Sequence, residues 1–328
     1  MPSGITHMFL VRDFLNKPDH DLDSDLKMKL AAGLSYFQTG AVGPDLPYAS
    51  SLDSNLLSSD TEAADLFHYN LTNKMVLEAF TNLKPMKSSL SGFELDCAFA
   101  FFLGYASHII ADGVMHPFVR DKVGDYEDNK TAHRILEMKL DVILVDNHYK
   151  HITPRLNLNF TNVHDELLNI IGDDNETTRK VLTLFTNAIK SVYSLSYDVD
   201  DIISWINALH GMLGFAEGDH PHIYRYLTSE LGLTFKNTSD LADERDDILI
   251  LTKPIDRKVN FLNRPSIHFI DDCIPRFHAK FHAFSKKAYL YIYHNGPALT
   301  PVDLPEINLD TGRYIANNKL EEIPALWA

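Results

Sequence analysis

The chain has 328 residues, of which 45% are hydrophobic and 23% charged, a balance typical of a soluble globular protein with one large or two ordinary domains. Its formal net charge of −15 argues against a function that depends mainly on contacts with nucleic-acid phosphates, because such contacts require a basic surface. A phosphate-ester substrate stays open, because bound divalent metals can reverse the local sign of a cleft.

Apolar residues recur at helical spacing along most of the chain, so the predicted fold class is all-α. The spacing predicts helices over 4–15, 24–38, 61–82, 91–115, 131–152, 162–171, 176–194, 198–214, 220–231 and 268–293. Ser91 and Glu94 form a capping-box pattern at the start of a long helix that should end near Pro117. A Gly/Pro-rich loop is expected at 39–51, and 247–253 is the best strand candidate.

The composition changes near residue 235. Before it lies a histidine-rich helical block, and after it come a polar stretch, a Pro-punctuated segment, a last long helix and a Pro-rich tail. We therefore predict a main helical domain over 1–235 and a C-terminal, mostly helical extension over 236–328 that packs on it.

The two cysteines, Cys97 and Cys273, lie in apolar surroundings, which favours buried free thiols over a disulfide. A cysteine-based zinc site is therefore excluded, and any metal must be held by His, Asp and Glu. The N-terminus lacks the basic and apolar regions of a secretory signal, and the longest apolar runs are too short or too polar to span a bilayer. A cytoplasmic location is expected.

The stretch SHIIADGVMHPF places His108, Asp112 and His116 four residues apart, and His133 and Glu137 follow at the same spacing. Residues four apart lie one turn above each other on the same face of a helix. Imidazoles and carboxylates that converge from such faces are ligands for a zinc-type divalent metal. The pattern therefore predicts a multinuclear metal site on two neighbouring helices, which indicates a hydrolase.

Each of these pairs also has a purely structural interpretation. His108 and Asp112 are alternatively a buried hydrogen-bonded pair, since a buried carboxylate must be paired or bind a cation. His133 and Glu137 are alternatively a surface pair, and Glu137 is also placed to pair with Arg134. Spacing alone leaves both interpretations open.

Three further candidates lie outside this stretch. Asp45 sits in the punctuated turn GAVGPDLPY, where a turn-forming Asp is the alternative. His68 lies on a helical face and is alternatively a core histidine, and His7 is alternatively a surface histidine. Asp141 continues the face of His133. Weaker candidates, which lack carboxylates on the same face, are His220, His222, His278 and His282.

The order His7, GPDLPY, His68, FFLGYASHIIADGVMHPF and HRILE resembles the zinc-dependent phospholipase C family of bacteria, over about residues 1–150. The same pattern occurs in the catalytic part of glycosylphosphatidylinositol-specific phospholipase D. Single-strand zinc nucleases of fungi and plants are more distant relatives with the same fold. The resemblance implies an all-α, multi-helix phospholipase C/nuclease-like catalytic domain that holds three zinc ions in a cleft.

The resemblance also implies a ligand set. The first zinc would be bound by Asp45, His68, His108 and Asp112. The second would be bound by His116, His133 and Glu137. Asp112 would bridge the first to a third metal, for which His7 is the matching ligand.

Two departures from the family pattern concern this cluster. Secreted members use the free amine of the processed N-terminus as a third-site ligand, whereas this chain starts Met1-Pro2-Ser3-Gly4. The third site is thus expected to lack a ligand or to bind a weaker or different metal. The spacing from His108 to His116 is shorter than in the secreted phospholipases and closer to that of the phospholipase D branch.

The function implied is that of a zinc-dependent phosphodiesterase of phospholipase C type, which cleaves a phospholipid head group with a metal-activated water. Asp45 would orient the nucleophile or act as a general base. Two or three Zn²⁺ ions are expected, or other divalent metals in their place. The expected partners are a phospholipid or other phosphodiester and, transiently, a membrane surface, contacted through 47–57 or 279–294, although core packing is favoured for both segments.

Two alternatives stay open. One is a nuclease or nucleotidase on the same scaffold, against which the charge of −15 argues. The other is a non-catalytic binding protein that keeps a metal for stability, in which four protein ligands would close the site.

Overall fold

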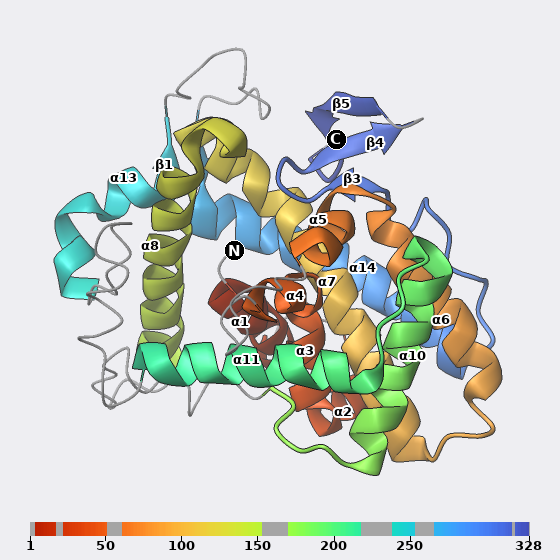
Figure 1. Ribbon diagram of the computed structural model, residues 1–328. Coiled ribbons are helices and arrows are strands. Elements are labelled where there is room, and N and C mark those ends of the chain that lie inside the picture. The colour runs from red at the N-terminus through yellow and green to blue at the C-terminus, as the bar shows by residue number, and fades with distance from the viewer. Residues whose placement is uncertain are drawn as a thin grey trace.

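The computed structural model describes residues 4–17, 22–50, 61–152, 170–217, 238–252, 266–316 and 319–327. The predicted all-α class is confirmed (Figure 1). The helices up to residue 217 are α1 (Gly4–Asn16), α2 (Ser24–Ala32), α3 (Leu34–Ala41), η1 (Gly43–Asp45), α4 (Leu46–Ala49), α5 (Thr61–Tyr69), α6 (Thr72–Met86), α7 (Gly92–Val123), α8 (Tyr126–Ile152), α10 (Glu176–Tyr193) and α11 (Val199–Glu217).

The C-terminal part contains short strands beside its helices. Its elements are η5 (Thr238–Glu244), α13 (Arg245–Leu249), β1 (Ile250–Leu251), β2 (Ile267–His268), η7 (Phe269–Cys273), α14 (Ile274–Tyr293), β3 (Ile307–Asn308), β4 (Arg313–Ala316) and β5 (Lys319–Pro324). Strands β1 and β2 pair antiparallel, and β3, β4 and β5 form an antiparallel sheet in that order. The strand expected at 247–253 is partly wrong, since α13 occupies its start.

Helix α7 is the central element, and α1, α2, α3, α6, α8, α10 and α14 all pack on it (Figure 1). Its predicted capping box is present, with Ser91 Oγ accepting from Glu94 N at 3.2 Å and Glu94 Oε2 accepting from Ser91 N at 2.7 Å. Among the described helices, α7 is long and apolar enough to cross a membrane, contrary to our expectation from the apolar runs. Its apolar stretch is wholly buried inside the protein, as in the core helix of a globular domain.

The predicted end of this helix near Pro117 is wrong. Helix α7 continues to Val123 and ends at Gly124, whose positive φ of +92° is readily adopted only by glycine. A proline inside a helix removes one backbone donor, here the one that would serve the Gly113 carbonyl. The C-terminal part packs over this turn, because a Cβ on Gly312 would lie 2.8 Å from Gly113 O and 2.7 Å from Pro117 Cγ.

The helix expected at 24–38 is divided at Gly33, and the one at 61–82 is divided at Leu71, whose φ is +52°. The loop expected at 39–51 is partly helical, since α3 continues to Ala41 and η1 and α4 follow. Local Gly and Pro residues predicted irregular backbone here, but packing against α7 imposes helical turns instead.

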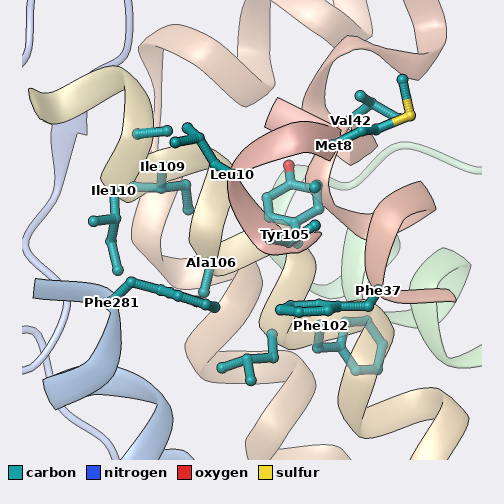
Figure 2. Packing of buried hydrophobic residues seen from close by; sticks show 14 of the residues in the cluster. Met8, Leu10, Phe37, Val42, Phe102, Tyr105, Ala106, Ile109, Ile110 and Phe281 are labelled. Carbon is teal, nitrogen blue, oxygen red and sulfur yellow. The ribbon is translucent and has the colours of Figure 1, made fainter. Parts of the chain in front are cut away.

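Helices α3 and α7 cross at two glycines. A Cβ on Gly40 would lie 1.9 Å from Phe101 O, and one on Gly104 would lie 2.1 Å from Phe37 O. Only glycine permits this approach of the two backbones. Large side chains such as Phe37 and Phe102 fill the core around the crossing (Figure 2).

The predicted helical C-terminal extension is confirmed in α14, which packs on α7 and α6. Core packing of the aromatic residues in 279–294 is also confirmed, because Phe281, Phe284 and Tyr289 are buried. The Pro-rich tail contributes β3 to β5, which no sequence pattern indicated. The helix expected at 220–231, most of that at 162–171, and the domain boundary near 235 lie outside the described residues.

Candidate metal centre

The structure brings the eight predicted ligands together from five elements. Helix α1 contributes His7, the η1 turn Asp45 and α5 His68, whereas α7 contributes three ligands and α8 two. The buried set, none more than 6% exposed, consists of His7, Asp45, His68, His108, Asp112, His116, His133 and Glu137. Isolated ionisable groups are rarely buried to this degree, so their convergence indicates a built site.

The ligand atoms fall into three groups, within each of which they lie no more than 4.8 Å apart. The groups are His7, His108 and Asp112; Asp45, His68 and His108; and His116, His133 and Glu137. The last matches the ligand set implied for the second zinc, and the first two share His108. Each group could hold one metal ion.

Asp112 lies among three imidazoles. Its Oδ1 is 3.1 Å from His7 Nε2 and 3.6 Å from His116 Nε2, and its Oδ2 is 3.1 Å from His108 Nε2. Two ligands of one tetrahedral zinc, each at 2.0–2.1 Å, lie about 3.3 Å from each other. The separations around Asp112 therefore match those of ligand atoms that share metal ions.

Three of the histidines have a fixed tautomer. Nδ1–H of His68 donates to Ala64 O at 2.7 Å, that of His108 donates to Ala41 O at 2.8 Å, and that of His116 donates to Leu309 O. A carbonyl oxygen can only accept, so Nδ1 carries a proton, and in the neutral imidazole Nε2 presents its lone pair to the cluster. Metal-binding histidines are oriented by second-shell hydrogen bonds of this kind.

Further support for a metal comes from buried polar atoms that have no hydrogen-bond partner among the described residues. Within the cluster these atoms are His7 Nδ1, both carboxylate oxygens of Asp45, His68 Nε2, His108 Nε2, Asp112 Oδ2, His133 Nδ1 and Glu137 Oε2. Burying a polar atom without a partner costs about 1–3 kcal/mol. Divalent cations would satisfy most of these atoms at once, so the residues fit zinc.

Electrostatics keep the carboxylates ionised. Burial opposes ionisation, but neighbouring imidazoles hold the pKa of Asp112 well below its usual range and lower that of Glu137 to about 2. Burial likewise opposes protonation of the histidines, yet the Asp45 carboxylate raises the pKa of His68 to about 9, and Asp112 and Glu137 raise that of His116 to about 10. In the absence of metal, protons thus offset the negative charge that zinc would neutralise.

A cavity of about 30 Å³ lies among the ligands, lined by His7, Asp112, His116 and Glu137 together with apolar side chains. That volume is enough for one water-sized group. The cavity touches two of the three ligand groups, so a small molecule inside it would contact both.

The model of the zinc-dependent phospholipase C family matches residues 6–198. The chain belongs to the zinc-dependent phospholipase C family. The match covers more than half of the chain, and it extends beyond residue 150, where the recognisable motifs end. Neither a comparison with curated proteins nor one with solved structures found a match.

Membership places this phospholipase C family protein among hydrolases, with all eight candidate ligands inside the matched range. Asp141, which follows Glu137 by one turn, is in none of the three ligand groups. It accepts a hydrogen bond from Thr6 Oγ1 at 2.5 Å, and burial raises its pKa well above the usual range. Asp141 therefore supports the packing of α1 on α8.

Several groups around the cluster were not predicted. The Tyr126 ring packs edge-on against His133, and the Tyr48 ring lies 5.6 Å from that of His68. Asp310 accepts a hydrogen bond from the hydroxyl of Tyr69. No fixed spacing marks such contacts, and the carbonyl of Leu309 has no side-chain signature at all.

The weaker histidine candidates do not form a metal group in the described part of the chain. A carboxylate does reach His278, but it comes from α1, since His278 Nε2 lies 2.7 Å from Asp13 Oδ2. His220 and His222 lie outside the described residues. Cys97 and Cys273 are buried free thiols, as predicted.

Proposed function

We propose that the protein is a zinc-dependent phosphodiesterase that hydrolyses the head-group phosphodiester of a phospholipid, in the manner of a phospholipase C. The main support is the buried cluster in which His68, His108 and His116 all present Nε2 toward carboxylates. The family's name supports a phospholipid as the substrate.

Zinc ions bound here would supply a water of lowered pKa and positive charge for the phosphate oxygens. The protein's part is to hold that charge in place. Asp112 contacts three imidazoles and so ties the ligand groups to each other. The backbone carbonyls behind the histidines prevent the rings from turning away from the site.

Asp45 is the proposed group for the attacking water. It is 2% exposed, and His108 and His68 lower its pKa despite burial, so it is a carboxylate at neutral pH. One oxygen, Oδ1, lies 3.2 Å from His68 Nε2, which leaves Oδ2 to accept a hydrogen bond from water. A low pKa makes Asp45 a weak base, so orientation of the water is its main proposed role.

A substrate comparison tests this function. Zinc-loaded protein would be assayed on mixed vesicles of phosphatidylcholine and phosphatidylinositol, on bis(p-nitrophenyl) phosphate and on a single-stranded oligonucleotide. We expect diacylglycerol and a phosphorylated head group from the vesicles, lost on chelation and restored by zinc. Asp45→Asn should lower the turnover at least 100-fold, whereas Asp13→Asn should retain it, because Asp13 pairs with His278 and is in none of the three ligand groups.

Two results would contradict the proposal. Cleavage of the oligonucleotide alone would establish a nuclease. Fully zinc-loaded protein without turnover on any of the three substrates would indicate a metal-stabilised binding protein.

A further inference from the structure

One residue outside the family match joins two ligand-bearing helices. The Leu309 N–H donates to His68 O at 2.9 Å, and the Leu309 carbonyl accepts from His116 Nδ1. His68 and His116 belong to different metal-ligand groups. The backbone of a single buried residue, Leu309, which is 0% exposed, therefore holds a member of each group.

The segment around Leu309, residues 304–313, is here called the strap. Its start is bound to α6. Asn73 Nδ2 donates to Leu304 O at 2.8 Å, and Thr72 Oγ1 exchanges hydrogen bonds with both backbone groups of Ile307, at 2.8 and 3.2 Å. Asp310 adds a bond to Tyr69, the residue after His68. The strap thus bonds to His68, Tyr69, Thr72 and Asn73, within a span of six residues that starts at the His68 ligand.

The other side of the strap packs on α7 between two ligands. A Cβ on Gly113, one residue after Asp112, would lie 2.5 Å from Ile307 Cδ1. Gly312, with φ +63°, reaches the backbone of the same turn, and Gly312 N donates to Asn308 O at 2.8 Å to close the turn of the strap. Glycine is needed at Gly312, where φ is positive and an added Cβ would meet backbone, and Gly113 lets the side chains of Ile307 and Leu326 lie directly against α7, so this docking is specific and dense.

We propose that the strap is an integral part of the metal centre, in which the Leu309 backbone fixes His68 and His116 relative to each other, an inference that rests on the zinc centre of the proposed function. Leu309 is a positioning residue, since it contacts ligands and not substrate. Zinc binding and strap docking are then one coupled equilibrium. Coupling is reciprocal, so whatever factor the docked strap adds to zinc affinity, zinc adds to strap docking.

Hydrogen exchange on the full chain measures this coupling without reference to activity. Amide exchange in the peptide that covers 304–313 would be followed by mass spectrometry with zinc and with a chelator. We expect zinc to slow exchange there about 10-fold or more, the size of a second-shell effect on affinity. A peptide from α10, which contributes no ligand, should change little; strap exchange that is indifferent to zinc would overturn the inference.

If chelation unfolds the whole protein, α10 also loses protection and hydrogen exchange no longer isolates the strap. Variants of the strap contacts then test the coupling. Thr72→Val removes both bonds to Ile307, and its control is Thr178→Val, another buried threonine, which bonds Tyr36 and Asp173 O. Zinc transfer to a chromophoric chelator should be 10–100-fold more favourable for Thr72→Val than for the control. Zinc retention equal to that of the control would show that the strap is only structural.

Asn308→Ala is the second strap variant, in case Thr72→Val does not fold. Asn308 Oδ1 accepts from Thr311 N at 3.1 Å and Thr311 Oγ1 at 3.0 Å, in a partly exposed turn. Asn308→Ala should weaken zinc retention, as Thr72→Val does, and unchanged retention would again overturn the inference. Normal strap coupling without phospholipid hydrolysis would instead overturn only the proposed function.

Discussion

Two buried histidine–carboxylate arrangements in this protein differ in how the carboxylate is surrounded. At the first, His278 of α14 lies 2.7 Å from Asp13 of α1, whose side chain is 26% exposed. At the second, the Asp112 side chain is 2% exposed and lies 3.1–3.6 Å from three imidazoles. The first is one direct contact to a partly exposed carboxylate, and the second places one buried carboxylate among three imidazoles, at separations that ligands of shared cations also have.

The difference shows what separates a structural pair from a metal centre. One imidazole satisfies one oxygen of a carboxylate with a hydrogen bond, and a partly exposed carboxylate such as that of Asp13 also reaches solvent. A carboxylate among three imidazoles, two of which, His108 and His116, have Nδ1 bonded to carbonyls, leaves more lone pairs than protons to share. Ligand density and buried lone pairs therefore indicate zinc, where the i,i+4 spacing of the sequence could not.

The largest expected effect comes from removing the two carboxylates in turn. Asp112→Ala should abolish phosphodiesterase activity and lose at least two zinc ions per chain, because Asp112 contacts ligands of all three groups. Asp13→Ala should keep its zinc and lose about 1–3 kcal/mol of unfolding free energy, the cost of a buried unpaired partner. Plasma mass spectrometry for zinc and chemical denaturation measure both. Equal zinc contents in Asp112→Ala and Asp13→Ala would contradict the distinction between a metal centre at Asp112 and a structural pair at Asp13.

The second effect concerns pH. In the metal-free protein, the pKa values of His68 and His116, about 9 and 10, lie above the ordinary value of 6.5. The stability that these two protonated histidines contribute is fully present below pH 6.5 and is lost as the pH rises through 9 to 10. Zinc binds neutral imidazole, so its apparent affinity should rise up to about 10-fold per pH unit for each proton displaced.

Melting temperatures with zinc and with a chelator, between pH 6.5 and 9, check this expectation. The stabilisation by zinc should grow with pH, through both the rising affinity and the falling stability of the metal-free protein. A stabilisation that stays constant or shrinks toward pH 9 would show that zinc does not displace protons from these histidines.

The smallest expected effect concerns the helix packing that supports the metal centre. The crossing of α3 and α7 places Ala41 O against His108 Nδ1, and Gly104 permits that crossing. Gly104→Ala should cost about 1–3 kcal/mol through overpacking and weaken zinc retention. Gly211→Ala is the matched control, because its added Cβ meets nothing within 4 Å in an exposed helix position, and it should gain about 0.4–1 kcal/mol. Thermal unfolding with zinc quantitation distinguishes the two.

Local rules explain which parts of the site were predictable. His108, Asp112 and His116 lie on one face of α7 because helical periodicity alone places them there. Helix α7 passes Pro117 because tertiary packing by the C-terminal part outweighs the propensity of one residue. The role of Leu309 was beyond prediction, since a backbone carbonyl about 190 residues away in sequence leaves no residue pattern. The chemistry of the ligands could therefore be predicted from the sequence. The docking of segments that are distant in sequence could not.

The most direct test is anomalous diffraction from crystals of the zinc-loaded protein, recorded above and below the zinc absorption edge. The account predicts two or three peaks, among the Nε2 atoms of His68, His108 and His116 and the carboxylates of Asp45, Asp112 and Glu137, and no peak at His278 and Asp13. A single peak elsewhere, or none in the cluster, would contradict a multinuclear zinc centre.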